Sequence, residues 1–200
     1  MNLIYGTKNP AKVAAMKRRL STIHVPIQGL LELGQEIPEI PETGNSPLEN
    51  ARQKAFAYYQ IFHQPVFSCD SGLYLEQVPE ELQPGVHVRT IQGRSLTDDE
   101  MIAYYSGLAK KYGDLKARYH NAICLVVDET HSYEAMDESM ASKPFLMTSI
   151  PHARRKEGFP LDSLSIEISS GRYYYDIEKK ELDEVAVEDG FLSYQLIMKQ

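Results

Sequence analysis

The residues with the clearest chemical potential are one carboxylate and the small residues that follow it. Residues 65–69 form an uncharged run that leads into Asp70, and Ser71 and Gly72 come next. This pattern predicts a buried strand that ends in a turn and presents Asp70 at its carboxyl end, which is where open α/β sheets bind ligands. Asp-Ser-Gly is also favourable turn chemistry, so the same residues fit an ordinary surface turn.

A second candidate group follows a short strand predicted over residues 2–6. The next loop holds Thr7 and Asn9, and a helix is predicted over residues 10–20 with Lys12 in its first turn. Free N–H groups, the helix dipole and an ammonium at one helix N-terminus together attract an anion such as phosphate. The simpler interpretation is that Asn9 is the N-cap and Lys12 is a solvated surface residue.

Two more carboxylates lie near the start of the next predicted helix. Ser46, Pro47 and Glu49 form a capping box with proline at the first helical position, which predicts a helix over residues 47–62. Glu42 precedes this pattern and is not needed by it. Glu49 fits two roles, as part of the helix cap or as a metal ligand.

The rest of the chain alternates helical and strand patterns. A second capping box at Thr97 starts an amphipathic helix that ends near Gly113, and a buried central strand is predicted within residues 116–128. A neighbouring strand, exposed on one face, is predicted at residues 132–139. Shorter strands are predicted within 23–40 and at 73–75, 145–150, 165–168 and 173–177, and a short helix at 191–197. This order is consistent with one α/β or α+β domain over residues 1–200.

The composition excludes several classes of protein. The 200 residues carry a net charge of −7, which argues against a broad nucleic-acid surface because phosphate contacts need clustered Lys and Arg. No apolar run reaches the roughly 18 residues of a membrane span, and the N-terminus lacks a signal-peptide layout. Cys69 and Cys124 do not make a disulfide framework. We therefore expect a cytoplasmic protein that binds neither nucleic acid nor membranes.

Five segments of the chain match known motifs in order and at similar separations. They are Thr7-Lys8-Asn9-Pro10-Ala11-Lys12, Pro41-Glu42-Thr43-Gly44, Glu49-Asn50-Ala51 with Lys54-Ala55, Asp70-Ser71-Gly72-Leu73, and Pro84-Gly85 with Arg89. Together they resemble the inosine triphosphate pyrophosphatase family, well over residues 1–90 and faintly afterwards. The resemblance implies an α/β fold with a long twisted mixed sheet flanked by helices, and two lobes with a central cleft. It also implies hydrolysis of deaminated purine nucleoside triphosphates to the monophosphate and pyrophosphate.

The resemblance also implies roles for individual residues. Asp70 deprotonates the attacking water, and magnesium, which prefers oxygen ligands, is held by Glu42 and Asp70 with Glu49 as a further candidate. The implied phosphate-binding residues are Thr7, Asn9, Lys12, Lys54 and Arg89. The implied base-binding residues are Phe159 and Asp162. A homodimer is expected, as is usual in the family.

Two departures from the family pattern leave alternatives open. Cys69 stands where most members have an acidic residue, and a thiol is a poor magnesium ligand. Residues 159–163 read Phe-Pro-Leu-Asp-Ser in place of Phe-Gly-Tyr-Asp-Pro, and no Ser-His-Arg occurs near the C-terminus. One alternative is a non-catalytic nucleotide-binding sensor or partner subunit on the same fold. The other is a related pyrophosphatase with a different base preference.

Overall fold

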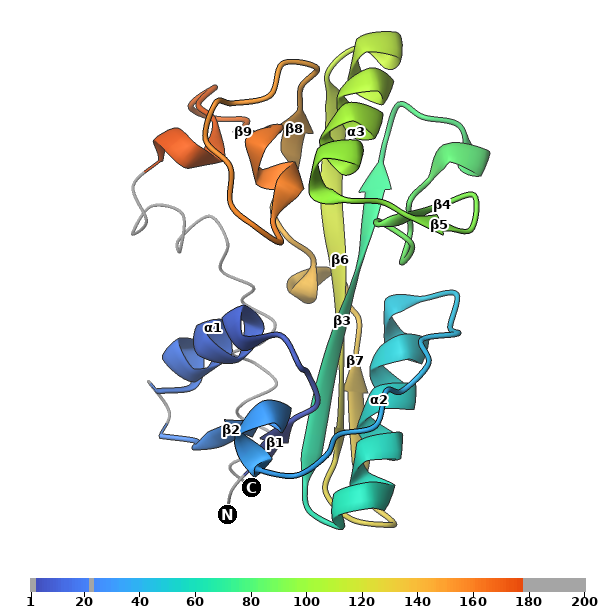
Figure 1. Ribbon diagram of the computed structural model, residues 1–200, viewed down its shortest axis with the longest axis vertical. Helices are drawn as coiled ribbons and strands as arrows, with labels where there is room; N and C mark the ends of the chain where they lie inside the picture. Colours follow the sequence, from blue (N-terminus) through green and yellow to red (C-terminus); the bar gives the residue numbers. More distant parts are fainter. Residues whose placement is uncertain (1–2, 22–23, 178–200) are drawn as a thin grey trace. The chain divides into compact units, whose positions relative to one another are not determined.

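The computed structural model describes residues 3–21 and 24–177, which form two compact units (Figure 1). Of these residues, unit 1 contains those up to Ser71 together with Asn121–Met140. Unit 2 contains Gly72–His120 and those from Ala141 onward. The helix predicted at residues 191–197 lies outside the described residues.

Unit 1 is built on a mixed sheet. Strand β1 (Leu3–Tyr5) pairs in parallel with both β2 (Ile27–Gly29) and β3 (Val66–Leu75). The order then continues from β3 to β6 (Leu115–Val126), which pairs antiparallel with β7 (Ser132–Ala135). Parallel strands need crossover connections, and helices provide them here.

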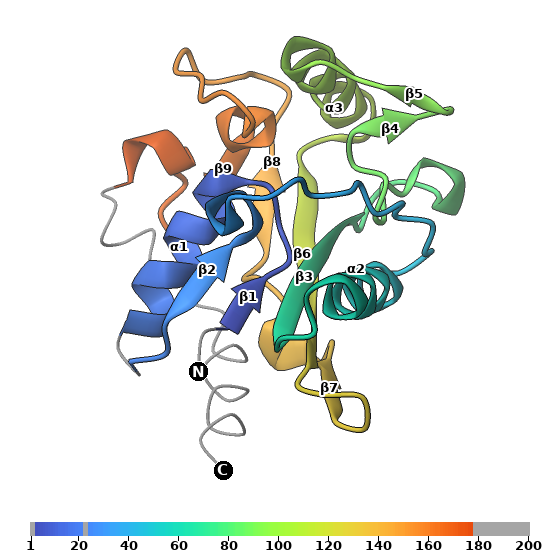
Figure 2. The same cartoon turned by 60° about the horizontal axis from the view of Figure 1, so that its bottom comes forward.

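Two helices cover opposite faces of the unit 1 strands (Figure 2). Helix α1 (Pro10–Leu20) packs into a core cluster that includes Phe67, whereas α2 (Pro47–Phe62) packs into one that includes Val66. Successive side chains of a strand point to opposite faces, so the alternation along β3 separates the two clusters. The predicted helices 10–20 and 47–62 are confirmed at both ends.

Unit 2 has its own core around one helix and antiparallel strands. Helix α3 (Asp98–Tyr112) begins at the predicted capping box and ends at Gly113. Strand β8 (Phe145–Met147) pairs with β6 and with β9 (Ser165–Glu167). A small hairpin joins β4 (Thr90–Ile91) to β5 (Arg94–Ser95). Short 3-10 turns occupy Leu30–Leu33, Glu80–Leu82, Glu138–Met140, Pro160–Ser163 and Tyr174–Asp176.

The α/β class is confirmed, with a mixed sheet flanked by helices. Both cysteines are free, as the sequence predicts. No helix within residues 3–21 and 24–177 has the length and apolar character needed to cross a membrane.

The turn predicted at Ser71 and Gly72 is wrong. Strand β3 continues to Leu75, so Asp70 lies in the middle of a strand and not at its end. The backbone stays extended because Leu73 exchanges two backbone hydrogen bonds with Gly85, at 2.9 and 3.0 Å. A Cβ on Gly72 would lie 3.2 Å from the Gly85 backbone. The glycine therefore permits a close approach of two backbones and does not make a turn.

The strand predicted at residues 173–177 is also wrong. Three tyrosines favour a strand by propensity, but only a single bridge joins Tyr173 to Ile166. The next residues form a 3-10 turn, in which Asp176 donates its N–H to the Tyr173 carbonyl at 2.9 Å. The predicted strand 132–139 is shorter than expected, because β7 ends at Ala135.

Candidate active site

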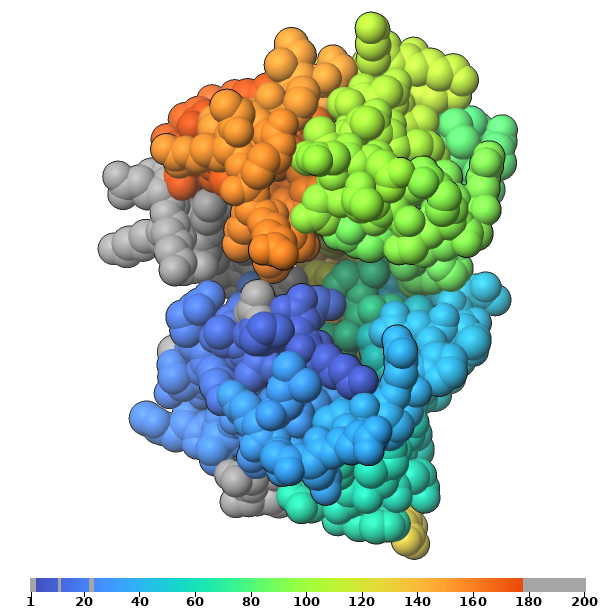
Figure 3. Space-filling view, in the orientation of Figure 1, coloured from blue at the N-terminus to red at the C-terminus, as the bar shows by residue number. Residues whose placement is uncertain are grey.

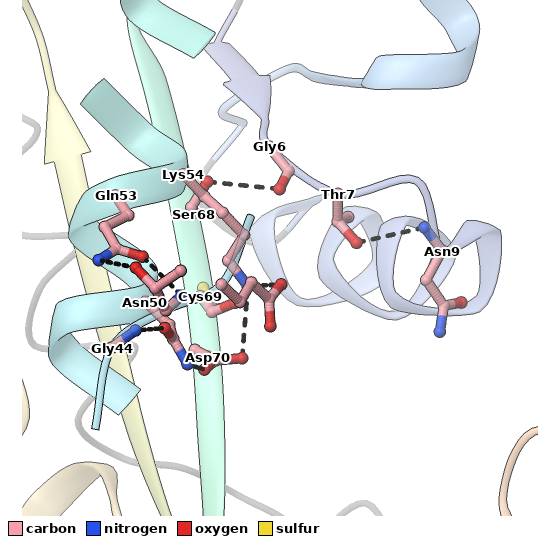
Figure 4. Close-up of polar contacts among 12 residues, drawn as sticks. Gly6, Thr7, Asn9, Gly44, Asn50, Gln53, Lys54, Ser68, Cys69 and Asp70 are labelled. Carbon is pink, nitrogen blue, oxygen red and sulfur yellow. Dashed lines mark hydrogen bonds and ion pairs between the residues drawn. The ribbon is translucent and has the colours of Figure 1, made fainter. Parts of the chain in front are cut away.

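Asp70 is held at both carboxylate oxygens by helix α2. Asn50 donates from Nδ2 to Oδ2 at 3.0 Å, and Lys54 donates from Nζ to Oδ1 at 3.3 Å (Figure 4). Asn50 and Lys54 are four residues apart, so they lie on the same face of the helix. The strand and the helix are both rigid elements, which suits a catalytic carboxylate.

Lys54 joins this carboxylate to a second one. Its Nζ also donates to Glu42 Oε1 at 2.9 Å and lies 3.4 Å from the Cys69 carbonyl oxygen. The Lys54 side chain is only 11% exposed. Burial acts to lower the pKa of Lys54, but the Asp70 and Glu42 carboxylates outweigh it and raise that pKa above its ordinary value. The lysine is therefore a cation shared by two carboxylates.

The segment that carries Glu42 is fastened to α2 residue by residue. Residues 42–45, here called the Glu42 loop, make side-chain contacts with four positions in the first two turns of the helix. The pairs are Glu42 with Lys54, Thr43 with Gln53, Gly44 with Asn50, and Asn45 with Glu49. The stretch leading into this loop, light blue in Figure 3, lies at the surface of unit 1. Helix α2 therefore sets the position of Glu42 even though the side chain is exposed.

Glu49 is used at the start of the helix. Ser46 Oγ accepts the Glu49 N–H at 3.2 Å, which is half of the predicted capping box. The Glu49 carboxylate accepts the Asn45 N–H at 2.7 Å in place of the Ser46 N–H. Of its two predicted roles, the structure contains the capping one.

The loop between β1 and α1 has the geometry of a capped helix start. Asn9 Oδ1 accepts the Lys12 N–H at 3.3 Å, and Thr7 Oγ1 accepts the Asn9 N–H at 3.2 Å. The N-cap interpretation of Asn9 is confirmed. Lys12 is exposed in the first turn, so an ammonium and a helix N-terminus lie together. Phosphate binding by Thr7, Asn9 and Lys12 stays a prediction.

Gly6 fixes this loop to β3. Its N–H donates to the Phe67 carbonyl at 2.7 Å, and Ser68 Oγ donates to the Gly6 carbonyl at 3.3 Å (Figure 4). A Cβ on Gly6 would lie 2.1 Å from Ser68 Oγ. Any larger residue would push the loop away from the strand two residues before Asp70.

We expect Gly6→Ala to lower the free energy of unfolding by about 1–3 kcal/mol, because the added methyl overpacks a buried contact. Gly107→Ala is the matched control, since Gly107 is exposed in α3 and a Cβ there meets no atom within 4 Å. That control should stabilise the protein by about 0.5–1 kcal/mol. Urea unfolding measures both, and equal stability of the two variants would contradict the packing described for Gly6.

Cys69 points away from the Asp70 group. Its side chain packs with the core cluster on the α1 face, whereas Asp70 faces α2. Because neighbouring strand residues alternate, an acidic side chain at position 69 would also point to the α1 face. The cysteine therefore removes no side chain from the group formed by Lys54, Glu42 and Asp70.

The remaining predicted residues lie in unit 2. Arg89 donates to Asp98 Oδ1 at 2.6 Å and to the Leu96 carbonyl at 2.9 Å. The Lys156 ammonium lies 3.9 Å from the centroid of the Phe159 ring. Burial raises the pKa of Asp162, and the positive charge of Lys156 offsets part of this rise. Their predicted phosphate and base contacts stay predictions.

Asn50 and Gln53 contact the site, although no motif in the sequence predicts a separate role for either residue. Asn50 occurs on a helix face shared with Ala51 and Ala55, which are fully buried. A polar residue among core positions needs a hydrogen-bond partner, and its spacing of four from Lys54 directs both to one place. This signal was present in the sequence, but the partner, the Glu42 loop, was not predictable.

No group of three or more His, Cys, Asp or Glu that could hold a metal ion occurs within residues 3–21 and 24–177. The pair formed by Glu42 and Asp70 is smaller than such a group. It nevertheless contains two carboxylates that face a single cation.

Comparison with known proteins identifies the family. The family model described as the Ham1 family matches residues 3–170. The chain belongs to the Ham1 family. This membership confirms the resemblance drawn from the motifs of residues 1–90.

Relatives of this Ham1 family member cover most of the chain. A dITP/XTP pyrophosphatase of Malacoplasma penetrans is 31% identical over 141 residues, covering 68% of this chain and 67% of that protein. A dITP/XTP pyrophosphatase of an Exiguobacterium species is 28% identical over 184 residues, covering 90% of this chain and 88% of that protein. The solved Ham1 protein of Staphylococcus aureus matches with a TM-score of 0.77 at 16% identity, covering 100% of both chains, and supports the fold.

Proposed function

We propose that this protein is a nucleoside triphosphate pyrophosphohydrolase that releases a nucleoside monophosphate and pyrophosphate. Non-standard purine nucleotides such as ITP, dITP and XTP are the proposed substrates, since the curated relatives are dITP/XTP pyrophosphatases. The observation that carries the proposal is the Asp70 carboxylate, buried on a strand and paired with a lysine that also binds Glu42. A carboxylate positioned in this way suits the activation of water.

Magnesium is the proposed cofactor, with Glu42 and Asp70 as its protein ligands. The donor set fits, because both side chains offer carboxylate oxygens and both already contact the same cation, Lys54 Nζ, at 2.9 and 3.3 Å. Magnesium is commonly bound by one or two carboxylates together with substrate phosphates. Glu49 is the weaker third candidate, since its carboxylate already accepts the Asn45 N–H. The bound metal would neutralise phosphate charge and polarise the phosphoryl group.

The side chains of unit 1 supply the remaining chemistry of this proposal. Asp70 accepts a proton from the attacking water, while its other carboxylate oxygen stays bonded to Asn50. Lys54 provides positive charge against the negative charge that builds on the phosphate oxygens. The N-terminus of α1, with Lys12 in its first turn, holds the anionic end of the substrate.

Several finer statements belong to the same proposal. Arg89 is proposed to contact phosphate, and Phe159 and Asp162 are proposed to contact the base. We also propose a cytoplasmic homodimer that binds neither nucleic acid nor membranes. The net charge of −7 supports one part of this proposal, the absence of a broad nucleic-acid surface. The non-catalytic alternative loses one of its two motivations, because the Cys69 side chain packs on the face opposite Asp70. Its other motivation, the changed base-reading segment at residues 159–163, stands.

The test is pyrophosphate release from inosine, xanthosine and standard nucleoside triphosphates, measured with and without magnesium. We expect release that requires magnesium and is fastest with the inosine or xanthosine compounds. If release is fastest with a standard nucleotide, the protein is still a pyrophosphohydrolase, but the proposed preference for inosine or xanthosine is wrong. No release from any nucleotide by the folded protein would overturn the enzymatic proposal, and a rise in melting temperature with a triphosphate would then favour the non-catalytic binder.

A further inference from the structure

Asn50 has a buried side chain, and both the oxygen and the nitrogen of its amide make hydrogen bonds. The residue is 2% exposed. Its Oδ1 accepts the Gly44 N–H at 2.8 Å, and its Nδ2 donates to Asp70 Oδ2 at 3.0 Å. If the amide oxygen and nitrogen of Asn50 were exchanged, its NH2 group would face the Gly44 N–H, which is also a donor. Its oxygen would face Asp70 Oδ2, which is also an acceptor. Since unpaired buried polar groups are costly, the amide has one allowed orientation.

The bond to Asp70 makes its two carboxylate oxygens different. Oδ2 is held by the neutral amide of Asn50, which leaves Oδ1 directed at the Lys54 ammonium. Oδ1 therefore faces the cation that Asp70 shares with Glu42. Turning the carboxylate plane out of this orientation would break both contacts, whereas a half-turn only exchanges two equivalent oxygens.

The hydrogen bond from Gly44 also fixes the Glu42 loop to Asn50. Gly44 lies two residues after Glu42, and a Cβ at Gly44 would lie 2.7 Å from Asn50 Oδ1. Only glycine allows the loop to approach the amide so closely. One side chain thus connects the strand that carries Asp70 with the loop that carries Glu42.

We propose that Asn50 is a positioning residue for the hydrolysis, which fixes the orientation of the Asp70 carboxylate and its placement relative to Glu42. The inference rests on the proposed function. It adds that Asn50 acts through these two carboxylates and makes no contact with the substrate.

The near-isosteric variant Asn50→Asp separates the two arms of the amide. One oxygen of the new carboxylate still accepts the Gly44 N–H. The other faces Asp70 Oδ2, and because two buried carboxylates so close together cannot both stay ionised, Asp70 loses its neutral amide donor and shares a proton with the new acid. The variant therefore keeps the Gly44 arm and changes only the arm that contacts Asp70.

The matched control is Gln53→Glu, the same amide-to-acid change on the same helix. Gln53 Oε1 accepts the Thr43 N–H at 3.1 Å, and Nε2 donates to Thr43 Oγ1 at 3.1 Å. A glutamate keeps the first bond and accepts the threonine O–H in the second. The control therefore adds the same charge without disturbing Asp70.

The experiment measures kcat and KM for magnesium-dependent pyrophosphate release, with a melting curve for each protein. We expect Asn50→Asp to lower kcat by about 100-fold, the effect of misplacing a reacting group by roughly 1 Å, with KM changed by less than about 3-fold. Gln53→Glu should stay within about 3-fold of wild type in both constants. Asn50→Ala adds no buried charge, and we expect it to lower kcat by at least about 10-fold, the loss of one hydrogen bond to a charged group.

The outcomes separate the inference from the proposed function. Wild-type turnover together with near-normal kcat in the folded Asn50 variants would overturn the inference alone. A change confined to KM would also overturn it, because it would indicate a substrate contact. Failure of Asn50→Ala to fold would assign Asn50 to stability and not to positioning. Absence of pyrophosphate release from wild type would overturn the function and the inference together.

Discussion

Replacing Asp70 with asparagine is expected to lower kcat by about 10²–10⁴-fold, the usual contribution of a general base. The amide is nearly the same size as the carboxylate, but it cannot accept a proton from water near pH 7. It also leaves Lys54 with one carboxylate partner, Glu42, in place of two. The rate of pyrophosphate release at saturating substrate measures the effect.

The control for this variant is Glu36→Gln, which removes one negative charge at an exposed position of the same unit. Its kcat should equal that of wild type within about 2-fold, because a surface substitution away from the site changes little. Melting temperatures of both variants exclude unfolding as the cause. A folded Asp70→Asn protein with more than a tenth of wild-type kcat would remove Asp70 from the role of base.

The helices were predictable because local chemistry marks their ends. Ser46 with Pro47, and Thr97 with Glu100, are capping signals within four residues of sequence, and both helices begin where these signals are. The structure adds a detail that the pattern does not contain. Glu49 bonds to the N–H of Asn45 and not of Ser46, because the preceding loop folds back along the helix.

One error occurs where a distant contact decides the backbone, and the other where a local turn replaces the expected strand. Asp70, Ser71 and Gly72 have turn composition, yet Gly85, which lies 13 positions after Gly72, pairs with Leu73 and keeps the strand extended. The tyrosines at 173–175 have strand composition, yet hydrogen bonds three residues apart bend them into a turn. Residue propensity is a weak guide at both positions, because strand formation depends on pairing with a partner strand: Leu73 has such a pairing, and Tyr174 and Tyr175 form a turn instead.

The sequence predicts which residues belong to the candidate site, but it does not predict which of them contact one another. Asp70, Glu42 and Lys54 follow from the motifs, whereas the bonds among them depend on how the Glu42 loop folds back antiparallel to α2. The sequence suggests that Cys69 removes a metal ligand, and strand alternation in the structure directs that side chain to the other face. Patterns of residue type therefore identify the participants, and the packing of strand against helix determines which of them meet.

Replacing Lys54 with methionine is expected to lower the free energy of unfolding by about 3 kcal/mol, at the lower end of the cost of breaking a buried ion pair. Methionine keeps most of the side-chain volume but removes the cation between two carboxylates. Asp70 and Lys54 have side-chain exposures near one tenth, at 12% and 11%, so water cannot replace the lost charge fully. Glu42 is 48% exposed, which limits the loss.

The matched control is Lys17→Met, which breaks a lysine–glutamate ion pair that is shorter than either Lys54 pair but exposed to solvent. Lys17 Nζ lies 2.6 Å from Glu32 Oε1, with side-chain exposures of 43% and 45%. An exposed pair of this kind contributes about 0–1 kcal/mol. Urea unfolding of the two variants therefore compares the loss of stability when the same Lys→Met change is made at a buried ion pair and at an exposed one. Equal losses would contradict the claim that Lys54 is needed to neutralise the site.

Divalent cations extend the same comparison to the proposed metal site. At the proposed site, Lys54 and a metal ion would compete for the Glu42 and Asp70 oxygens of wild type. In Lys54→Met the carboxylates have no competing ammonium, so magnesium should raise the melting temperature more than it does for wild type. Binding to the folded state alone stabilises it by mass action, and Lys17→Met should respond as wild type does. If magnesium raises the melting temperature of all three proteins equally, the metal does not bind at Glu42 and Asp70. Lys54 would then only neutralise the two carboxylates.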